Sequence, residues 1–439
     1  MRMRYAVILA VSFAAMAQAR AQATQATARP ISLTDAVRLA QRNSPATVQA
    51  RGQIASGGAA LRSAYGAFLP NINVSASAAR SGGDRFNTAG QLVPLAGEPW
   101  QYNDGISANV ELFSGFRRFS ELRAAKADIA SAEANETLQE FNIALNVKQQ
   151  YYNVLAARES ESAARSQLEQ AEQQLRAAAA RVAQGAATKS DSLRSVIQVG
   201  NARLALLTAQ NNLRVGNASL TRLIGSSDLV TAIDDTTQLS ISLAAVDSAQ
   251  LAAWAEDGPA VRQARASLTA ANAASRTARA PYLPTLNLSF SRSGSGFDNR
   301  FGYGDKRYSY GDNLRFSVSY PLFNGFAREE QVTRTRVQED IAFAQLRDAR
   351  LAAQQQFVQH LGTLRLADER VQIQRASVEA AEEDLRVQQQ RYALGASTLL
   401  DLLTSQLTLN QARAALIQAR YDARVARAQI EALIGREIR

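Results

Sequence analysis

The sequence has no cysteine and only one histidine, His360, in 439 residues. Without thiols the chain cannot form disulfides or thiolate zinc sites, and one imidazole is too few for a multi-histidine metal site. Nucleophilic catalysis of the Ser–His type would depend on His360 alone, which lies inside a long helical pattern where we expect a packed or solvated residue. The composition therefore predicts a protein that is not an enzyme and holds no metal ion and no cofactor.

No apolar run reaches the roughly 20 residues that a membrane-spanning helix requires. The apolar run at residues 5–16 follows Arg2 and Arg4 and precedes small-x-small sites between Ala17 and Ala23, which is the pattern of a secretory signal peptide. An N-terminal membrane anchor is the alternative, and the shortness of the run disfavours it. We therefore expect residues 1–23 to be removed and the mature chain to be exported.

Basic residues outnumber acidic ones by 49 to 39, which gives a net charge of +10. Such a balance can indicate nucleic acid or an anionic membrane surface as the partner. Removal of the predicted signal peptide takes away two or three arginines and leaves +8 or +7, and an exported protein rarely meets nucleic acid. We therefore expect no nucleic acid partner and assign the basic balance mostly to solvated helices.

Four motifs occur twice in the chain. The segments at residues 64–77, 111–116, 181–195 and 220–225 resemble those at 278–291, 321–326, 391–405 and 430–435. Gly185 and Gly395 are 210 residues apart, as are Gly225 and Gly435, and a shared offset argues against chance similarity. The sequence therefore predicts an internal duplication. The expected parts are a signal peptide (1–23), a first repeat (24–225), a linker or equatorial segment (226–247) and a second repeat (248–439), each repeat having a helix, a β-hairpin, a long helix and a return helix.

Four segments alternate apolar and polar residues, the pattern of strands with one apolar face. Their apolar positions are Ile72, Val74, Ala76 and Ala78, then Ile106, Ala108, Val110 and Leu112, then Leu286, Leu288 and Phe290, and finally Leu314, Phe316, Val318, Tyr320 and Leu322. Long polar connections at residues 80–103 and 292–312 separate the two strands of each half. We expect four strands arranged as two hairpins.

The segments at residues 114–184 and 326–394 are rich in Ala, Gln and Arg and contain no proline. They predict two helices of about 70 residues, each about 105 Å long at 1.5 Å per residue. Apolar side chains recur every seven residues, as in Phe357, Leu364, Val371, Val378, Leu385 and Tyr392, which indicates coiled-coil packing; the matching seam of the first half is Val147, Val154, Leu168, Leu175 and Val182. A glycine-containing turn at Gly185 or Gly395 then leads into a return helix, so each half ends in a helical hairpin.

Amphipathic strands in an exported chain indicate a transmembrane β-barrel. A soluble, half-buried sheet is the alternative, but helices of about 100 Å cannot wrap around so small a sheet to cover its apolar face. Four strands cannot close a barrel, and an open edge in hydrocarbon would leave backbone groups without hydrogen bonds. Closure must therefore be shared between copies: eight strands from a dimer would be filled by side chains, whereas twelve from a trimer would leave a lumen.

At residues 31–435 the chain resembles the TolC-like outer-membrane efflux proteins. The matching motifs are the Leu-Pro dipeptides at 69–70 and 283–284, LFSGF at 112–116, LFNGF at 322–326, YALGASTLLDLLTSQ at 392–406 and ALIG at 432–435. The resemblance implies an α+β membrane protein of Gram-negative bacteria: a homotrimer with a 12-stranded outer-membrane β-barrel, continued in the periplasm by a long α-helical coiled-coil barrel. It implies a passive exit duct of a tripartite efflux or type I secretion system, docked to a periplasmic adaptor and powered by an inner-membrane transporter.

The resemblance also implies a periplasmic gate at the hairpin tips. Asp401 would form a carboxylate ring around the trimer axis, with Asp191 as its counterpart; the alternative is that both merely complement the positive start of a helix. Tyr392 matches a gate tyrosine of the family but also falls on the heptad seam. In this chain Thr404 and Ser397 replace a second carboxylate and a linking arginine of the family. Lys189, Arg194 and Arg391 are the nearby candidates to replace the missing pairing.

The hairpin tips resemble the sites where the family docks its adaptor. Their residues are Gly185, Ala186, Ala187, Gly395, Ala396 and Ser397. The two glycines most economically supply the left-handed backbone that ends a helix. The small side chains beside them would let another helical hairpin approach.

Two other functions remain open at this point. An outer-membrane enzyme such as a lipase would need a nucleophile and a base, for which His360 is a poor candidate. A periplasmic coiled-coil adaptor or structural scaffold protein shares the helical hairpins but lacks four amphipathic strands. Solubility of the mature chain without detergent would favour the adaptor or scaffold.

Overall fold

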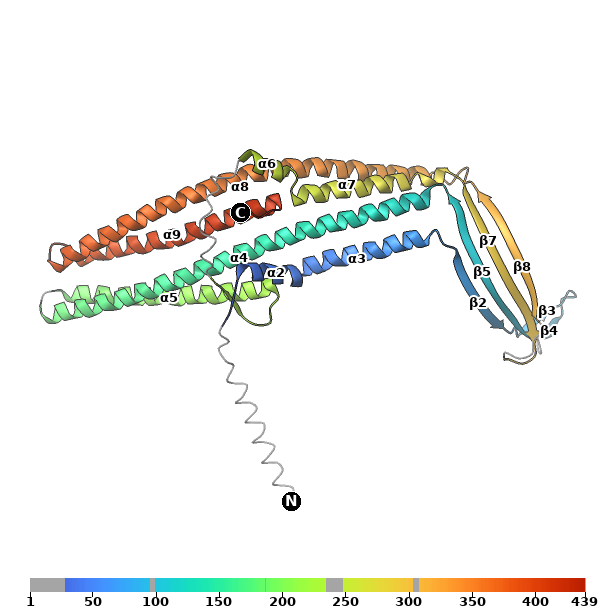
Figure 1. The fold of residues 1–439 in the computed structure, drawn as a ribbon. Helices are drawn as coiled ribbons and strands as arrows, with labels where there is room; N and C mark the ends of the chain where they lie inside the picture. The colour runs from blue at the N-terminus through green and yellow to red at the C-terminus, as the bar shows by residue number, and fades with distance from the viewer. Residues whose placement is uncertain (1–27, 95–98, 186, 234–247, 303–307, 439) are drawn as a thin grey trace, which may run out of the picture. The chain divides into compact units, whose positions relative to one another are not determined.

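A computed structural model describes residues 28–94, 99–185, 187–233, 248–302 and 308–438 (Figure 1). The predicted signal peptide, Ala186 and residues 234–247 of the predicted linker lie outside the described residues. The helices are α2 (Leu33–Asn43), α3 (Pro45–Gly66), α4 (Arg117–Ala183), α5 (Lys189–Ile224), α6 (Ser248–Glu256), α7 (Pro259–Thr277), the short 3-10 helix η3 (Ala280–Tyr282), α8 (Ala327–Ala393) and α9 (Leu399–Ile434). The strands are β1 (Arg29–Ile31), β2 (Asn71–Ala79), β3 (Asp84–Phe86), β4 (Leu92–Pro94), β5 (Trp100–Ser114), β6 (Val230–Ala232), β7 (Thr285–Asp298) and β8 (Tyr308–Ser319).

The long helices that the sequence predicts are confirmed. Helices α4 and α8 each have 67 residues, and their return helices α5 and α9 each have 36. At 1.5 Å per residue, 67 residues span about 100 Å. Among the helices that the structure describes, none combines the length and the apolar character needed to cross a membrane.

The chain divides into two compact units. The first, here called the hairpin unit, consists of Met1–Ala50, Glu136–Val261 and Arg350–Arg439. The second, here called the sheet unit, consists of Arg51–Asn135 and Arg262–Ala349. Each unit draws on both halves of the sequence, so the strands of the two halves share one sheet and the helical hairpins of the two halves share one bundle.

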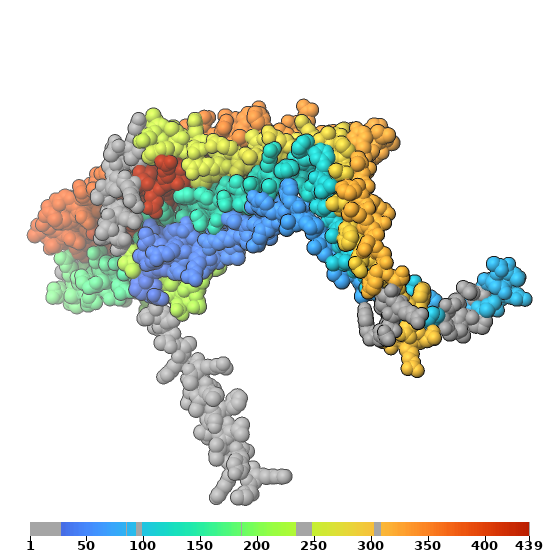
Figure 2. All heavy atoms as spheres, turned by 45° about the vertical axis from the view of Figure 1, so that its right-hand side comes forward, coloured from blue at the N-terminus to red at the C-terminus, as the bar shows by residue number. Residues whose placement is uncertain are grey.

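The sheet unit contains a four-stranded antiparallel sheet in the order β2-β5-β7-β8, with the strands of the two halves side by side (Figures 1 and 2). Its register places the apolar residues Ile72, Ala108, Phe290 and Leu314 in one cross-strand row. The rows on either side carry asparagine, serine and, on β8, Arg315; their side chains point to the opposite face because alternate residues of a strand face opposite ways. The apolar face is uncovered: Val318, for example, is 72% exposed.

The strands are longer than the alternation pattern predicts, so the predicted connections at residues 80–103 and 292–312 are wrong in extent. Strand β5 already begins at Trp100, and β7 and β8 continue to pair from Arg292 and Asp312 outward to Gly296 and Tyr308. The alternation fades there because charged residues and glycines take apolar positions, while the backbone pairing continues. A small hairpin, β3–β4, occupies part of the first connection.

A β-bulge explains why Leu112 does not continue the apolar series. The pairing of β5 with β7 shifts register between Glu111 and Phe113, and Leu112 has no partner across the ladder. Tyr320 and Leu322 likewise lie beyond the end of β8, so their predicted places in the strand are wrong. They belong instead to the turn that leads into α8.

The LFSGF and LFNGF motifs turn each last strand into its long helix. Each motif places two successive residues in the left-handed region, Gly115 and Phe116 (φ 59° and 65°) and Gly325 and Phe326 (φ 66° and 64°). At Gly115 a Cβ atom would lie 2.5 Å from the carbonyl oxygen of Ala280, so only glycine fits. The first turn is therefore tightly packed, whereas at Gly325 a Cβ atom would meet nothing within 4 Å.

The helices of the hairpin unit pack along seven-residue seams, as predicted, with one difference. In α8 the predicted positions Phe357, Leu364 and Leu385 are buried. In the distal part of α4 the buried residues are alanines at seven-residue spacing, Ala164, Ala171 and Ala178, rather than the predicted Leu168, Leu175 and Val182. Small side chains let the neighbouring helix approach closely, so the two helices can lie closer together along this seam than the larger predicted residues would allow.

Candidate functional site: the hairpin tips

The two return helices begin with the same capping arrangement. The Thr398 hydroxyl accepts a hydrogen bond from the Asp401 amide (3.2 Å), and Asp401 Oδ2 accepts from the amide and hydroxyl of Thr398 (2.9 and 2.7 Å). Thr188 and Asp191 form the same capping box at the start of α5. Both aspartates therefore complete a helix start, which is the alternative to the charge ring; the ring itself stays a prediction.

These hydrogen bonds also fix the charge of the two aspartates. The backbone and hydroxyl of Thr398 hold the pKa of Asp401 below its ordinary value, with a smaller contribution from the positive charge of Arg391. The hydroxyl and backbone of Thr188 lower the pKa of Asp191 in the same way, assisted by Arg194. Each carboxylate thus stays ionised at neutral pH on an exposed tip, as a charge ring would require.

Gly185 and Gly395 end α4 and α8 in the left-handed conformation that the sequence predicts, with φ of 72° and 74°. A Cβ atom at either glycine would meet nothing within 4 Å, so the backbone conformation alone calls for glycine here. Ala187, Ala396 and Ser397 lie in the same turns. Beside them Leu394 is 84% exposed, an apolar side chain on the tip that the pattern analysis did not single out.

Arg181 joins the two hairpins, and sequence analysis missed it. From the end of α4 its guanidinium donates to the carbonyl oxygens of Tyr392 (3.4 Å) and Ala393 (3.5 Å) at the end of α8. The same guanidinium lies 4.6 Å from the centre of the Tyr392 ring. A cation at the C-terminal end of a helix and over an aromatic face is favourable on both counts.

Lys189, Arg194 and Arg391, the residues expected to replace the family's link between neighbouring hairpins, do not form such a link among the described residues. Arg391 donates to the carbonyl oxygen of Ala396 within its own turn (3.5 Å). Lys189 and Arg194 form no ion pair with any residue that the structure describes. Arg181 occupies the position 210 residues before Arg391, so the repeat itself could have pointed to it.

Tyr392 has the packing role expected from the heptad seam, and its role in a gate stays a prediction. Its side chain packs against the buried cluster of Leu385, Leu399 and Leu402, and its ring faces Arg181. The Thr404 hydroxyl, by contrast, donates to the Leu400 carbonyl of its own helix (2.9 Å), and the Ser397 hydroxyl is buried without a hydrogen bond within the described part of the chain. Neither substituted position links the hairpins.

His360 is a helix residue on α8 facing Gln429 of α9. Burial lowers its pKa, and a hydrogen bond with Gln429 partly offsets that effect. No group of three or more potential metal ligands occurs among the described residues. The imidazole therefore has the packing environment that we expect from its place in the helical pattern.

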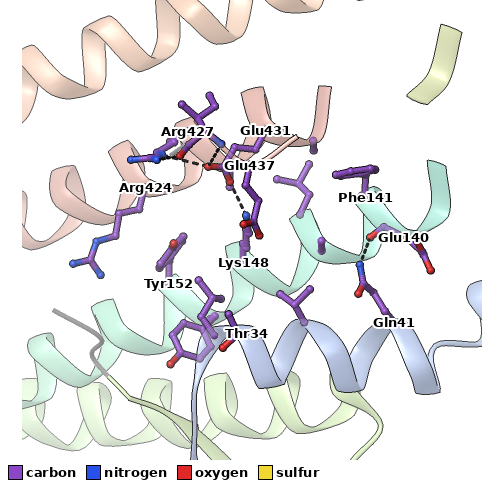
Figure 3. Close-up of a pocket in the computed structure, with 18 of the residues that line it drawn as sticks. Thr34, Gln41, Glu140, Phe141, Lys148, Tyr152, Arg424, Arg427, Glu431 and Glu437 are labelled. Carbon is purple, nitrogen blue, oxygen red and sulfur yellow. Dashed lines mark hydrogen bonds and ion pairs between the residues drawn. The ribbon is translucent and has the colours of Figure 1, made fainter. Parts of the chain in front are cut away.

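A cavity of about 870 Å³ lies in the hairpin unit between α2, α4 and α9 (Figure 3). At its wall Lys148 of α4 forms an ion pair with Glu431 of α9 (2.6 Å), and Arg427 holds the same carboxylate (3.3 Å). Gln41 of α2 donates to the carbonyl oxygen of Glu140 (3.1 Å). The Lys148–Glu431 ion pair joins the two halves of the chain away from the tips, and no sequence motif predicted it.

Comparison with known proteins identifies the family in which this architecture occurs. The family model described as outer membrane efflux protein matches residues 36–226 and 253–436. The chain is 27% identical over 345 residues to the pyoverdine export outer membrane protein OpmQ of Pseudomonas aeruginosa, covering 76% of this chain and 68% of that protein. It is 28% identical over 339 residues to the protein CyaE of Bordetella pertussis, covering 73% and 66%.

Solved structures show the same fold. The crystal structure of CusC superposes with a TM-score of 0.77 at 18% identity, covering 92% of each chain. That of the outer membrane protein VceC from Vibrio cholerae superposes with a TM-score of 0.74 at 19% identity, covering 93% of this chain and 97% of VceC. With a family model that spans most of its length, the chain belongs to the outer membrane efflux protein family.

Proposed function

We propose that the protein is a passive exit duct in the outer membrane of a Gram-negative bacterium, with a long periplasmic portion. The observation that carries the proposal is the four-stranded sheet with one uncovered apolar face and one face of serine and asparagine. Such a sheet suits a barrel wall between lipid and water. A periplasmic adaptor or scaffold protein does not need a sheet with an uncovered apolar face. An enzyme needs a nucleophile and a base, and the single histidine is a poor candidate for the base.

The closed form of this wall is a homotrimer. Strands β2 and β8 are the two edges of the sheet, and each edge needs a partner inside the membrane. Three copies joined β8 to β2 give twelve strands and a lumen, and the four long helices of each copy give a twelve-helix periplasmic tunnel. In this assembly residues 24–225 and 248–439 are the two repeats, and 226–247 belongs to an equatorial belt.

The hairpin tips form the gate and the docking site of this duct. Three copies of Asp401 place an ionised ring at the periplasmic mouth, which favours cations. Arg181 and Tyr392 hold the two hairpins of one protomer together in the closed state. Gly185, Gly395 and the small residues beside them, together with the exposed Leu394, give a periplasmic adaptor an apolar surface that a helical hairpin can approach closely.

The proposed partners determine how the duct opens and which cargo passes through it. Adaptor contact at the tips shifts the population toward an uncoiled, open state, and an inner-membrane transporter supplies the energy. Relatives carry the names of a pyoverdine export protein, an antibiotic efflux pump protein and a toluene efflux pump protein. Such variety suits a duct whose cargo is chosen by the transporter and not by the channel.

Disulfide crosslinking tests the trimer directly, because the natural chain has no cysteine of its own. One cysteine on β2 and one on β8 of the same chain are three strand spacings apart in one sheet, about 14 Å at 4.8 Å per spacing, too far for an intramolecular bond. Oxidation in membranes should therefore give dimers and trimers and nothing larger. The control pair Ser107→Cys and Ser291→Cys, adjacent on β5 and β7, should give only crosslinked monomers. A protein that stays monomeric and soluble without detergent would contradict the duct.

The Asp401 ring is tested by planar-bilayer recordings of Asp401→Ala beside Asp191→Ala. Both substitutions remove the same capping box, so helix fraying is matched between them. Asp401→Ala should lower the cation preference more than Asp191→Ala does. Equal selectivity in the two variants and the wild type would remove Asp401 from the gate.

A further inference from the structure

The polar face of the sheet is almost free of charge. It is formed by the residues that alternate with the apolar rows in β2, β5, β7 and β8, and nearly all of them are serine, asparagine, glutamine, threonine, glycine or alanine. Phe297 is the aromatic exception at the end of β7. The charged exceptions are Glu111 on β5 and Arg315 on β8.

The charge of Glu111 is compensated within the sheet unit. Arg117 at the start of α4 lies 2.7 Å from Glu111 Oε2, and Arg118 lies 4.0 Å from the same oxygen. The Glu111 side chain is only 21% exposed. This carboxylate therefore presents little charge to the space over the polar face.

Arg315 is uncompensated. Its cross-strand row runs from Asn71 through Asn109 and Ser289 to Arg315, so its neighbours on that row are amides and a hydroxyl. The Arg315 side chain is exposed and forms no ion pair or hydrogen bond with any residue in the described part of the chain. An exposed arginine keeps its hydration, so on an otherwise neutral face Arg315 presents a positive charge that can bind an anion from solution.

We infer that Arg315 is an anion-selectivity residue inside the barrel of the proposed duct. The inference rests on the proposed function, in which three copies close the sheet and the polar face lines the lumen. Each copy then contributes one guanidinium from the edge strand β8, beside the β2 edge of the next copy. The result is a ring of three positive charges on a wall of serine and asparagine. Its ligands are small anions and cargo that bears carboxylate or phosphate groups, which arginine binds in bidentate geometry.

Arg292 supplies a matched control. It lies on the adjacent strand β7 but on the opposite, apolar face, where it approaches Asp312 (3.9 Å) and stacks on the ring of Tyr310 (5.3 Å). Replacing Arg292 with glutamine removes the same charge from the same sheet without altering the polar face. The inference predicts that ion selectivity changes when a positive charge is removed from the polar face, and does not change when the same charge is removed from the apolar face.

The test measures reversal potentials in planar bilayers under a gradient of potassium chloride, for the full-length trimer and for Arg315→Gln, Arg315→Glu and Arg292→Gln. Three unit charges roughly 10 Å from a permeating ion, screened by 0.1 M salt, change the permeabilities of chloride and potassium a little over twofold in opposite directions, and so change the chloride-to-potassium permeability ratio roughly fivefold. Arg315→Gln should lower that ratio by this factor, and Arg315→Glu should lower it further. Arg292→Gln should leave it unchanged.

The outcomes separate this inference from the proposed function. Channels whose ion preference is the same in the wild type and both Arg315 variants would overturn the anion site while leaving the duct in place. An equal shift in Arg292→Gln would overturn the assignment of the polar face to the lumen. If the wild type and every variant fold as trimers but fail to conduct even when Arg181→Gln is added to open the gate, the duct itself fails, and the anion site fails with it.

Discussion

The contact between Arg181 and Tyr392 makes the strongest prediction about gating. Replacing Arg181 with glutamine removes the cation over the Tyr392 ring and weakens both hydrogen bonds to the α8 carbonyls. A cation–π contact at a partly exposed site and long hydrogen bonds together contribute about 1 kcal/mol. One protomer would then open about fivefold more readily.

In the proposed homotrimer, whose tips open together, this effect is multiplied. Three broken contacts sum to about 3 kcal/mol, which shifts the closed-to-open equilibrium by roughly a hundredfold. Single-channel recordings should therefore show a greatly increased open probability for Arg181→Gln without adaptor. Tyr392→Leu, which keeps an apolar side chain in the packed cluster, should open the channel less, because the hydrogen bonds to the backbone carbonyls remain.

Arg391→Gln is the matched control for Arg181→Gln. Arg391 lies at the equivalent position of the second half, and among the described residues it bonds to Ala396 in its own turn and acts on the charge of Asp401 in its own hairpin, so its loss should leave the open probability near that of the wild type. The reasoning would be refuted if Arg181→Gln behaved as the wild type does. It would be refuted equally if Arg391→Gln opened the channel as much as Arg181→Gln.

Three further predictions concern stability. Glu431→Gln removes the carboxylate that pairs with Lys148, whose side chain is only 16% exposed. The loss should lower the local stability of α4 and α9 by about 3 kcal/mol, as measured by hydrogen exchange. The control Glu382→Gln breaks an exposed ion pair with Arg413 and should cost less than about 1 kcal/mol. Gly115→Ala should lower the melting temperature of the detergent-solubilised protein clearly more than Gly325→Ala. Both substitutions strain a positive φ, but only Gly115→Ala places a Cβ atom against a carbonyl oxygen. Equal effects of the two substitutions would contradict the packing argument. The lowered pKa values of Asp401 and Asp191 mean that their capping contribution is complete above the ordinary carboxyl pKa, about 3.9, and is lost as the pH falls through the lowered values. Hydrogen exchange at the starts of α5 and α9, corrected for intrinsic rates, should therefore be constant from pH 7 to 5 and speed up only in stronger acid; loss of protection already between pH 7 and 5 would contradict it.

The sequence predicted the parts of the fold that depend on local pattern. Long runs without proline gave the long helices, and alternation gave the middle of every strand in the sheet. Alternation failed where Asp104, Gly294 and Tyr310 share a row of the apolar face, because the ring of Tyr310 covers Gly294 and reaches the Asp104 carboxylate (3.4 Å). The backbone pairing there is set by neighbouring strands and not by the residue pattern.

The parts of the candidate site that sequence analysis missed depend on packing between distant segments. The capping boxes at Thr188 and Thr398 are local, and the pattern around each aspartate indicated a helix start. The bond from Arg181 to Tyr392 joins residues 211 positions apart, and only the packing of α4 against α8 decides that Arg181, and not Arg391, makes it. The alanine seam of α4 was likewise missed because alanine carries little hydrophobic signal.

The open edges of the sheet have a genetic consequence. In the proposed homotrimer the ring of strands closes only when all three copies pair at both edges, so one defective copy also inactivates the two intact copies bound to it. If a variant blocked at the β2 edge still joins its neighbours through β8 and is made in equal amount with the wild type, only about one assembly in eight consists entirely of sound subunits. Such a variant is therefore dominant over the wild type, whereas a variant that cannot fold at all is recessive.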